Sequence, residues 1–369
     1  MIGREFTRRL LDRIANIRGQ TEGLLRELKA IELIYEKTLF PELAYMFKHA
    51  LTHDVAYNSL LVQRRRELHR LIGLAIEELY ADRLSEHYAV LAHHFSRAED
   101  GAKALDYLLK AAEKAANAFA SREALALYDQ ALGMAERLGE AVNVRTLLAI
   151  HEAKASIFFV TSDFEKAYVE GERVVALARR AGNSLKEAAA LAGMGFAALY
   201  SHKFERALVD SARAVAVGTE IGAQPTVLSA VFTTGWVHTV HGRLEQAKTE
   251  FDRVLTTSRS IGDGNNESWA LCLLAFLRNW QADYTEASRL MSEGLRLARE
   301  QNLLFQLINT LWGRGMVLIG KGDYDDALQT LEEARALSAK VGAEVVGHRI
   351  LNTLGWLYTE LGDLELACD

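Results

Sequence analysis

The chain has 369 residues, of which 50% are hydrophobic and 25% are charged, and it carries a formal net charge of −6. This composition excludes disordered and collagen-like chains, and the length exceeds what one compact core usually holds. Because no half of the chain is a basic block, neither a nucleic-acid partner nor binding to an anionic membrane is expected. Only two prolines occur, where ordinary usage of about 5% would give about 18, so we expect helix almost throughout.

The cysteines and the N-terminus bear on the cellular compartment. Cys272 and Cys368 are too few for a disulfide framework and are typical of a reducing compartment. The first residues, among them Arg4, Glu5 and Arg8, contain no apolar signal core. We therefore expect a cytoplasmic protein without a membrane-spanning segment.

The first hundred residues contain no repeat. Residues 1–14 and 24–37 have the spacing of two amphipathic helices, 39–61 include a short extended piece, and 63–80 have the pattern of a long helix. Two helices, an extended piece and a further helix are the outline of a winged-helix domain. This order predicts a small winged-helix-like head at residues 1–62.

Two pairs of histidines in this region could bind a metal ion. His49 and His53 are four residues apart and could share one face of a helix, and His93 and His94 are adjacent. Third and fourth ligands are not evident for either pair. We therefore expect structural roles for these histidines and no metal site.

A sequence repeat of constant period dominates the rest of the chain. Each copy has an apolar residue, an alanine three positions later, a small residue twelve positions before that alanine, and Gly or Asn fifteen positions after it. The four columns read Phe164, Phe204, Leu244, Tyr284, Tyr324 and Leu364; Ala167, Ala207, Ala247, Ala287, Ala327 and Ala367; Ala155, Gly195, Gly235, Ala275, Gly315 and Gly355; and Gly182, Gly222, Gly262, Asn302 and Gly342.

The columns predict two helices per repeat, each of roughly 15 residues and joined by a short polar turn. The second helix needs an N-cap, and Gly or Asn would close it in the left-handed conformation. The candidate N-caps are Asp163, Asp283, Asp323 and Asp363. The small residues twelve apart would lie where the two backbones approach closely. One such hairpin cannot bury its apolar face alone, so the copies are expected to stack into a solenoid.

This pattern resembles the tetratricopeptide repeat, whose consensus is W-x2-L-G-x2-Y…A-x3-F-x2-A. Leu351, Leu354, Gly355, Tyr358 and Ala367 follow that consensus. The period of 40 exceeds the usual 34 and implies longer helices.

The expected fold is therefore all-α: a tetratricopeptide-like α-solenoid of 40-residue helix pairs at residues 121–369, behind the winged-helix-like head. Residues 63–120 are expected to form connecting helices and a degenerate repeat. The last helix is cut after only a few residues, whereas solenoids usually end in a polar capping helix. We therefore expect the array to be truncated at its C-terminus.

Residues 1–100 also carry a family resemblance. The segments GREF, LxxLxxIELIYE, YMFKHALTHDVAYNSLL, RRRELH and LAHHF occur in this order. They are similar to the region that follows the nucleotide-binding module in STAND-type signalling ATPases. Such ATPases are often fused behind a class III adenylate/guanylate cyclase domain and ahead of a tetratricopeptide tail. The resemblance implies that an ATPase module and a cyclase lie upstream of Met1.

One part of this region implies a role for a single histidine. FKHALTHDVA is similar to the Met-His-Asp segment that ends the winged helix of NOD-like receptors, where the histidine reaches the ADP phosphate of the preceding module. His49 is the matching position, whereas Lys48 and Ala50 depart from the Met and Asp of the motif. The resemblance implies nucleotide-phosphate sensing by His49 in a longer parent protein. The alternative is that His49 packs in the interior.

The sequence contains no catalytic motif that we can identify. G-x4-G-K-[ST], G-x-G-x-x-G, H-E-x-x-H and C-x-x-C are all absent. We therefore predict no catalytic residue, no metal ligand and no cofactor, and we do not expect this chain to be an enzyme.

The candidate binding residues lie on the first helix of each pair, which lines the concave face of such a solenoid. One inward column reads Ser156, Phe196, Trp236, Phe276, Met316 and Trp356, and neighbouring inward positions add Phe232, Trp269, Asn279, Trp280, Asn309, Trp312 and Asn352. Aromatic residues with interspersed asparagines suit the binding of a peptide. The alternative is that neighbouring first helices bury the column as core.

Together these features predict a regulatory, non-catalytic region that binds a protein or peptide on its concave face. In this interpretation it senses a signal for an upstream STAND ATPase of an adenylate/guanylate cyclase. Two alternatives are the same architecture in a LuxR-type transcription activator and a stand-alone tetratricopeptide adaptor.

Overall fold

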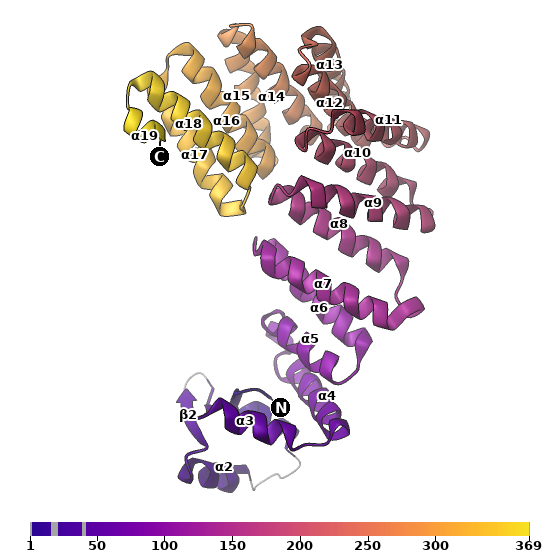
Figure 1. The fold of residues 1–369 in the computed structure, drawn as a ribbon, viewed down its shortest axis with the longest axis vertical. Helices are drawn as coiled ribbons and strands as arrows, with labels where there is room; N and C mark the ends of the chain where they lie inside the picture. Colours follow the sequence, from indigo (N-terminus) through magenta and orange to yellow (C-terminus); the bar gives the residue numbers. More distant parts are fainter. Residues whose placement is uncertain (1, 16–20, 39–41, 369) are drawn as a thin grey trace. The chain divides into compact units, whose positions relative to one another are not determined.

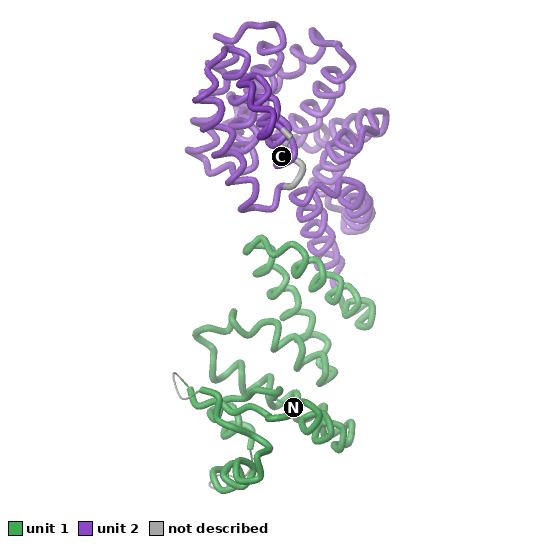
Figure 2. The backbone as a smooth tube through the Cα atoms, turned by 60° about the vertical axis from the view of Figure 1, so that its left-hand side comes forward, with its two compact units in different colours: residues 1–142 green, residues 143–369 purple. Residues whose placement is uncertain are grey.

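The computed structural model describes residues 2–15, 21–38 and 42–368 and divides the chain into two compact units. Unit 1 comprises residues 1–142 and unit 2 residues 143–369 (Figure 2). In the described ranges, no helix is long and apolar enough to cross a membrane.

Unit 1 begins with a three-stranded antiparallel sheet in the order β1-β3-β2. The strands are β1 Glu5–Thr7, β2 Ile34–Thr38 and β3 Ala44–Phe47, and the accompanying helices are α1 Arg8–Ile14, α2 Thr21–Ala30 and α3 Ala50–Asn58. Leu25 of α2, Ile34 of β2 and Tyr45 of β3 are buried together, with Phe6 and Leu11 packed against them. These contacts form the core of the N-terminal part.

The sequence analysis predicted more helix in this part of the chain than the structure contains. The predicted helix at 1–14 is wrong in its first half, because Phe6 pairs with Tyr45 in the sheet and α1 begins only after β1. The predicted helix at 24–37 ends early, because β2 pairs with β3. Residues 39–41 of the predicted extended piece lie outside the described residues. Short apolar segments fit a helix or a strand, and pairing with a distant strand decides between them.

Four further helices follow in the described part of unit 1. They are α4 Val62–Leu79, α5 Tyr88–Arg97, α6 Gly101–Asn117 and α7 Ser121–Leu138, with short 3-10 turns at Ala81–His87 and Gly139–Ala141. Helix α4 confirms the long helix predicted at 63–80. Helices α6 and α7 pack as a pair, and a Cβ on Gly101 would lie 2.8 Å from Leu138 Cδ2.

A buried histidine pair joins α4 and α5. The Nδ1 atoms of His69 and His94 are 2.8 Å apart, and both residues are 2% exposed. Two N–H groups cannot face each other at this distance, so one ring donates, the other accepts, and the two rings cannot both be charged. Burial lowers the pKa of His69 to about 4 and that of His94 to about 3.

Unit 2, within the described residues, is a row of six helix pairs (Figure 1). The first helices are α8 Val144–Val160, α10 Ser184–Tyr200, α12 Gln224–Val240, α14 Gly264–Trp280, α16 Leu304–Lys321 and α18 Glu344–Leu361; the second helices are α9 Phe164–Arg180, α11 Phe204–Glu220, α13 Leu244–Ile261, α15 Tyr284–Glu300, α17 Tyr324–Val341 and α19 Leu364–Cys368. Each helix begins one full period after its counterpart in the preceding pair. The predicted period and the predicted six helix pairs are confirmed.

The two helices of a pair approach closely where the sequence places small residues. A Cβ on Gly195 would lie 2.6 Å from Ser211 Oγ and 3.3 Å from the carbonyl oxygen of Ala207. A Cβ on Gly235 would lie 2.5 Å from a ring carbon of Phe251, which is itself almost fully buried. The predicted close approach is therefore confirmed at these sites.

The turns between successive helices of unit 2 use a residue with left-handed backbone. After the second helices these are the predicted Gly182, Gly222, Gly262, Asn302 and Gly342, and after the first helices they are Ser162, His202, Gly242, Ala282, Gly322 and Gly362. The second set was not predicted, because three of its members are not glycine. A single left-handed residue reverses the direction of the chain after a helix. Backbone N–H groups beyond the helix can then donate hydrogen bonds to the last carbonyl groups of that helix.

The four predicted aspartates all stand directly before a second helix, and three of them make a cap hydrogen bond. Asp163, Asp283 and Asp363 each accept a hydrogen bond from the backbone N–H three residues later. Asp323 also stands at the N-cap position of α17, but its side chain makes no cap hydrogen bond and instead accepts from Lys321 Nζ at 2.6 Å.

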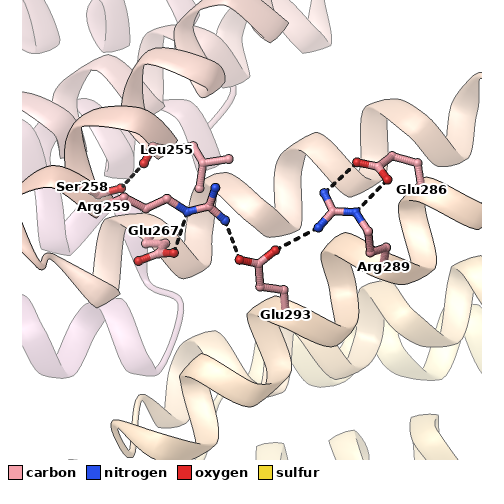
Figure 3. A network of polar contacts seen from close by, with 7 residues as sticks. All are labelled: Leu255, Ser258, Arg259, Glu267, Glu286, Arg289 and Glu293. Carbon is pink, nitrogen blue, oxygen red and sulfur yellow. Dashed lines mark hydrogen bonds and ion pairs between the residues drawn. The ribbon is translucent and has the colours of Figure 1, made fainter.

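Ion pairs connect α13, α14 and α15 (Figure 3). Arg259 at the end of α13 lies 2.9 Å from Glu267 of α14 and also pairs with Glu293 of α15. Arg289 lies 3.2 Å from Glu293 and 2.7 Å from Glu286. Exposed pairs of this kind contribute about 0–1 kcal/mol each, so apolar packing must supply most of the stability of the stack.

The close approach predicts opposite effects of one substitution at two glycines. Gly235→Ala should destabilise unit 2 by about 1–3 kcal/mol, because the added methyl group meets the buried Phe251 ring. Gly193→Ala should stabilise it by up to about 1 kcal/mol, because its Cβ meets Phe159 only at 3.7 Å and alanine favours the helix. Chemical denaturation measures both changes. Equal effects at the two sites would contradict the close-approach argument.

The histidine pair predicts acid sensitivity in unit 1. In the unfolded chain a histidine titrates near 6.5, whereas the folded pKa values of His69 and His94 are about 4 and about 3. The unfolded state therefore binds more protons between these limits, and stability is lost as the pH falls from about 6.5 towards 4. Hydrogen exchange in α4 and α5 should speed up between pH 7 and pH 5, after correction for the intrinsic rate. His94→Gln should flatten this dependence, and equal protection at both pH values would contradict it.

Candidate functional site

The candidate binding residues lie on the first helices of unit 2, and their side chains range from buried to more than half exposed. Trp269 and Phe276 of α14 are buried, with 8% and 5% exposure, whereas Trp280 and Trp356 are 55% and 41% exposed. The half-buried members are Phe196, Trp236, Trp312 and Met316. Neither alternative drawn from the sequence therefore describes the whole set, because part of it is core and part is surface.

The three candidate asparagines differ in the same way. Asn309 is buried, and its Nδ2 donates to the carbonyl oxygen of Phe305 at 2.8 Å, within its own helix. Asn352 is exposed. Asn279 is half-buried, and its Oδ1 is buried without a hydrogen-bond partner among the described residues. Asn352 thus keeps its polar groups available for a ligand, whereas Asn309 is bonded within its own helix and the unpaired oxygen of Asn279 is buried.

Aromatic rings form a continuous series that begins at Phe164 of α9 and continues across successive first helices. The ring centroids are separated by 4.8 Å for Phe164–Tyr200, 4.7 Å for Tyr200–Phe196, 6.3 Å for Phe196–Phe232, 5.2 Å for Phe232–Trp269 and 5.7 Å for Trp269–Phe305. Aromatic pairs attract one another at such separations. Sequence reasoning missed Tyr200, although it stands four residues after Phe196 just as Trp280 follows Phe276.

Two hollows open beside these rings. The larger has a volume of about 880 Å³, and Phe164, Tyr200, Trp236 and Arg349 are among the residues that line it. The second has a volume of about 480 Å³, and its lining includes Phe159, Phe196, Phe232, Trp269 and Asn266. A much smaller apolar pocket of about 60 Å³ is lined by Trp236, Phe276, Trp280, Trp312 and Met316, all of them predicted site residues.

Arg349 of α18 is a candidate site residue that the sequence analysis missed. Its guanidinium carbon lies 4.8 Å from the ring centroid of Tyr200 on α10 and 5.6 Å from that of Trp312 on α16. The solenoid therefore curves enough for its sixth pair to reach its second. Arg349 stands one repeat after Asn309 and two repeats after Trp269, so counting along the inward column could have found it.

Two titratable groups near the rings are unsuited to nucleophilic chemistry. Burial raises the pKa of the Tyr200 hydroxyl, and the nearby Arg349 guanidinium opposes this shift only in part. Burial also raises the pKa of the Cys272 thiol to about 12. Both groups therefore stay protonated near neutral pH, and the thiolate that reactive cysteines need is not formed.

His49 is an exposed residue at the start of α3. Its backbone is extended and its side chain makes no capping hydrogen bond, so it does not share a helix face with His53. The expectation that His49 packs in the interior is wrong. In the described part of the chain no group of three or more His, Cys, Asp or Glu side chains could hold a metal ion.

Comparisons with known proteins concern the repeats and the fold. Residues 306–367 match the tetratricopeptide repeat family. No curated protein matches the sequence. Among solved structures, the chain is similar to NprR in complex with its cognate peptide NprX, with 12% identity and a TM-score of 0.57 over 83% of this chain and 87% of that one.

Two further structures are similar at the same level. The Rap conjugation gene regulator of the plasmid pLS20, in complex with the Phr* peptide, has 14% identity and a TM-score of 0.55 over 85% of this chain and 89% of that one. The apo form of RapI has 11% identity and a TM-score of 0.53 over 71% of this chain and 93% of that one. Identities this low show a shared fold and nothing finer. The fold is a tetratricopeptide-like α-solenoid, as the sequence predicted.

Proposed function

We propose that this chain is a non-catalytic regulatory region whose solenoid binds a peptide, or a peptide-like segment of a protein. The binding surface in this proposal is the inner, concave face, which the first helix of each pair lines. The series of aromatic rings beside hollows of about 880 and 480 Å³ carries the proposal. Bound peptides place apolar side chains among such rings, while polar groups fix their backbone. NprR and the Rap regulator, which are similar in fold, were solved with peptides, and this adds support.

In this proposal the parent protein is a cytoplasmic STAND-type signalling ATPase of the adenylate/guanylate cyclase kind, and peptide binding biases its nucleotide switch. The support is the sequence resemblance of residues 1–100. The antiparallel ribbon of β2 and β3 behind two short helices is compatible with a winged-helix-like head. The exposure of His49 leaves its imidazole accessible to a phosphate of a preceding module.

The proposal predicts separate effects of two tryptophan substitutions. Trp280→Ala should change the melting temperature little, because the side chain is 55% exposed, but should weaken peptide binding by about 2 kcal/mol or more. Trp269→Ala should cost about 3–5 kcal/mol of stability, because Trp269 belongs to the core. The probe is a peptide selected on the wild-type chain from a random display library, and its affinity is measured by calorimetry.

Val209→Ala is the matched control for exposure. Val209 is 59% exposed and lies on the second helix α11, which carries none of the candidate binding residues. The Val209→Ala substitution should leave both stability and peptide affinity unchanged. If Trp280→Ala and Val209→Ala have the same effect on affinity, the inner face is not the binding surface.

The proposal also predicts that the purified chain neither hydrolyses ATP nor produces a cyclic nucleotide. The reason is that its sequence has no phosphate-binding loop and no recognisable pair of metal-binding carboxylates. Phosphate release and cyclic nucleotide formation should equal those of a buffer blank. Turnover that copurifies with the chain and disappears on a point mutation within it would overturn the non-catalytic assignment.

A further inference from the structure

Arg349 is a cation inside an aromatic hollow with part of its guanidinium unpaired. Its Nη1 atom is buried and has no hydrogen-bond partner among the described residues. Tyr200 and Trp312 lie against the guanidinium on two different helices, and cation–π attraction from their rings stabilises the charge. That attraction does not satisfy the N–H groups of Nη1, and a buried donor without a partner is costly.

The carboxylates that line the same hollow are already paired elsewhere. Asp163 Oδ2 lies 2.6 Å from Lys166 Nζ, and Glu165 Oε2 lies 2.5 Å from Lys203 Nζ. The hollow therefore presents Arg349 as a positive group that its own acidic residues do not neutralise. A carboxylate is the complementary group, because the planar fork of a guanidinium can bind its two oxygens together.

The surroundings of Arg349 indicate how such a carboxylate would be carried. Arg349, Tyr200 and Trp236 are among the residues that line the hollow of about 880 Å³. The apolar pocket of about 60 Å³ lies next to Trp312, and Trp236 lines both spaces. Binding space thus extends from the hollow past Trp236 into the pocket. A ligand that fills both spaces extends beyond Arg349, which favours an acidic side chain within a peptide over a chain terminus.

We propose that Arg349 binds the side-chain carboxylate of an Asp or Glu within the peptide ligand, while a neighbouring apolar residue of that peptide enters the pocket between Trp280 and Trp312. The proposal rests on the proposed peptide-binding function and names the chemistry of its ligand. It makes Arg349 the residue that selects acidic peptides.

The test uses the full chain and a random heptapeptide display library in which every selected peptide is resynthesised with a C-terminal amide. Selection on the wild-type chain should enrich peptides that contain Asp or Glu next to an apolar residue. Replacing that Glu by Gln in a selected peptide should weaken its binding to the wild-type chain by about tenfold or more, since hydrogen bonds to charged groups are the stronger ones. This measurement needs no protein variant.

Selection should then be repeated on Arg349→Gln and on Arg335→Gln. Arg335 lies on the second helix α17 and pairs with Glu332 at 2.7 Å, so its variant is the control for loss of one positive charge. Arg349→Gln should lose the acidic preference, and Arg335→Gln should keep it. Arg349→Lys keeps the charge but loses the fork, so it should retain a weakened preference.

The outcomes separate this proposal from the function on which it rests. Peptides bound without acidic preference, or an acidic preference that survives in Arg349→Gln, would overturn the role of Arg349 and leave peptide binding intact. Binding that depends on a free C-terminal carboxylate instead of the Glu side chain would also overturn it. Failure of every library to yield a binding peptide would overturn the peptide-binding function itself.

Discussion

The close approach of the two helices in each pair is the constraint on which the rest of unit 2 depends. At Gly195 and Gly235 the second helix leaves no room for a Cβ. The distance between the two helices of the pair and their rotation about their own axes are therefore fixed. In the first five pairs the two helices have nearly the same length, and the turns between helices use a left-handed residue. Residues one period apart therefore occupy equivalent positions, and the inner face is built column by column.

The aromatic residues of that face both hold the stack together and line its hollows. In α14 the column lies deep, and Trp269 and Phe276 belong to the core between neighbouring pairs. Trp280, one turn further along the same helix, is more than half exposed. A single aromatic side chain is large enough to bury one edge against a neighbouring helix and to present the other to a ligand. The core and the proposed binding surface are thus continuous in this solenoid.

The sequence was informative where structure is local and repeated. The boundaries of α8 to α19 could be predicted because small residues, turn residues and caps recur with one period, and each of them acts within a single pair. The strands of unit 1 could not, since β1 pairs with β3, which is distant in the sequence, and Phe6 fits a helical pattern equally well. Of the candidate site, the positions on the first helices that face the concave side could be predicted by counting along the repeat. The burial of Trp269 and Phe276 could not, because it depends on how closely successive helix pairs pack against each other.

Arg349 shows the limit of such reasoning most clearly. Its place in the inward column follows from counting, whereas its contact with Tyr200 follows from the curvature of the whole unit, which sums small rotations between successive pairs. No single repeat encodes that sum. The central claim is therefore that the regular pairs curve until the sixth pair faces the second across an aromatic hollow.

A nuclear Overhauser measurement on the full chain, with arginine, tyrosine and phenylalanine selectively labelled, tests this claim most directly. The account predicts a cross peak between the Arg349 side chain and the Tyr200 ring that disappears in Arg349→Gln. The contact between Phe196 and Tyr200 lies within α10 and serves as the internal reference. If the reference peak is present and the Arg349–Tyr200 peak is absent, the solenoid is more open than described here and the central claim is wrong.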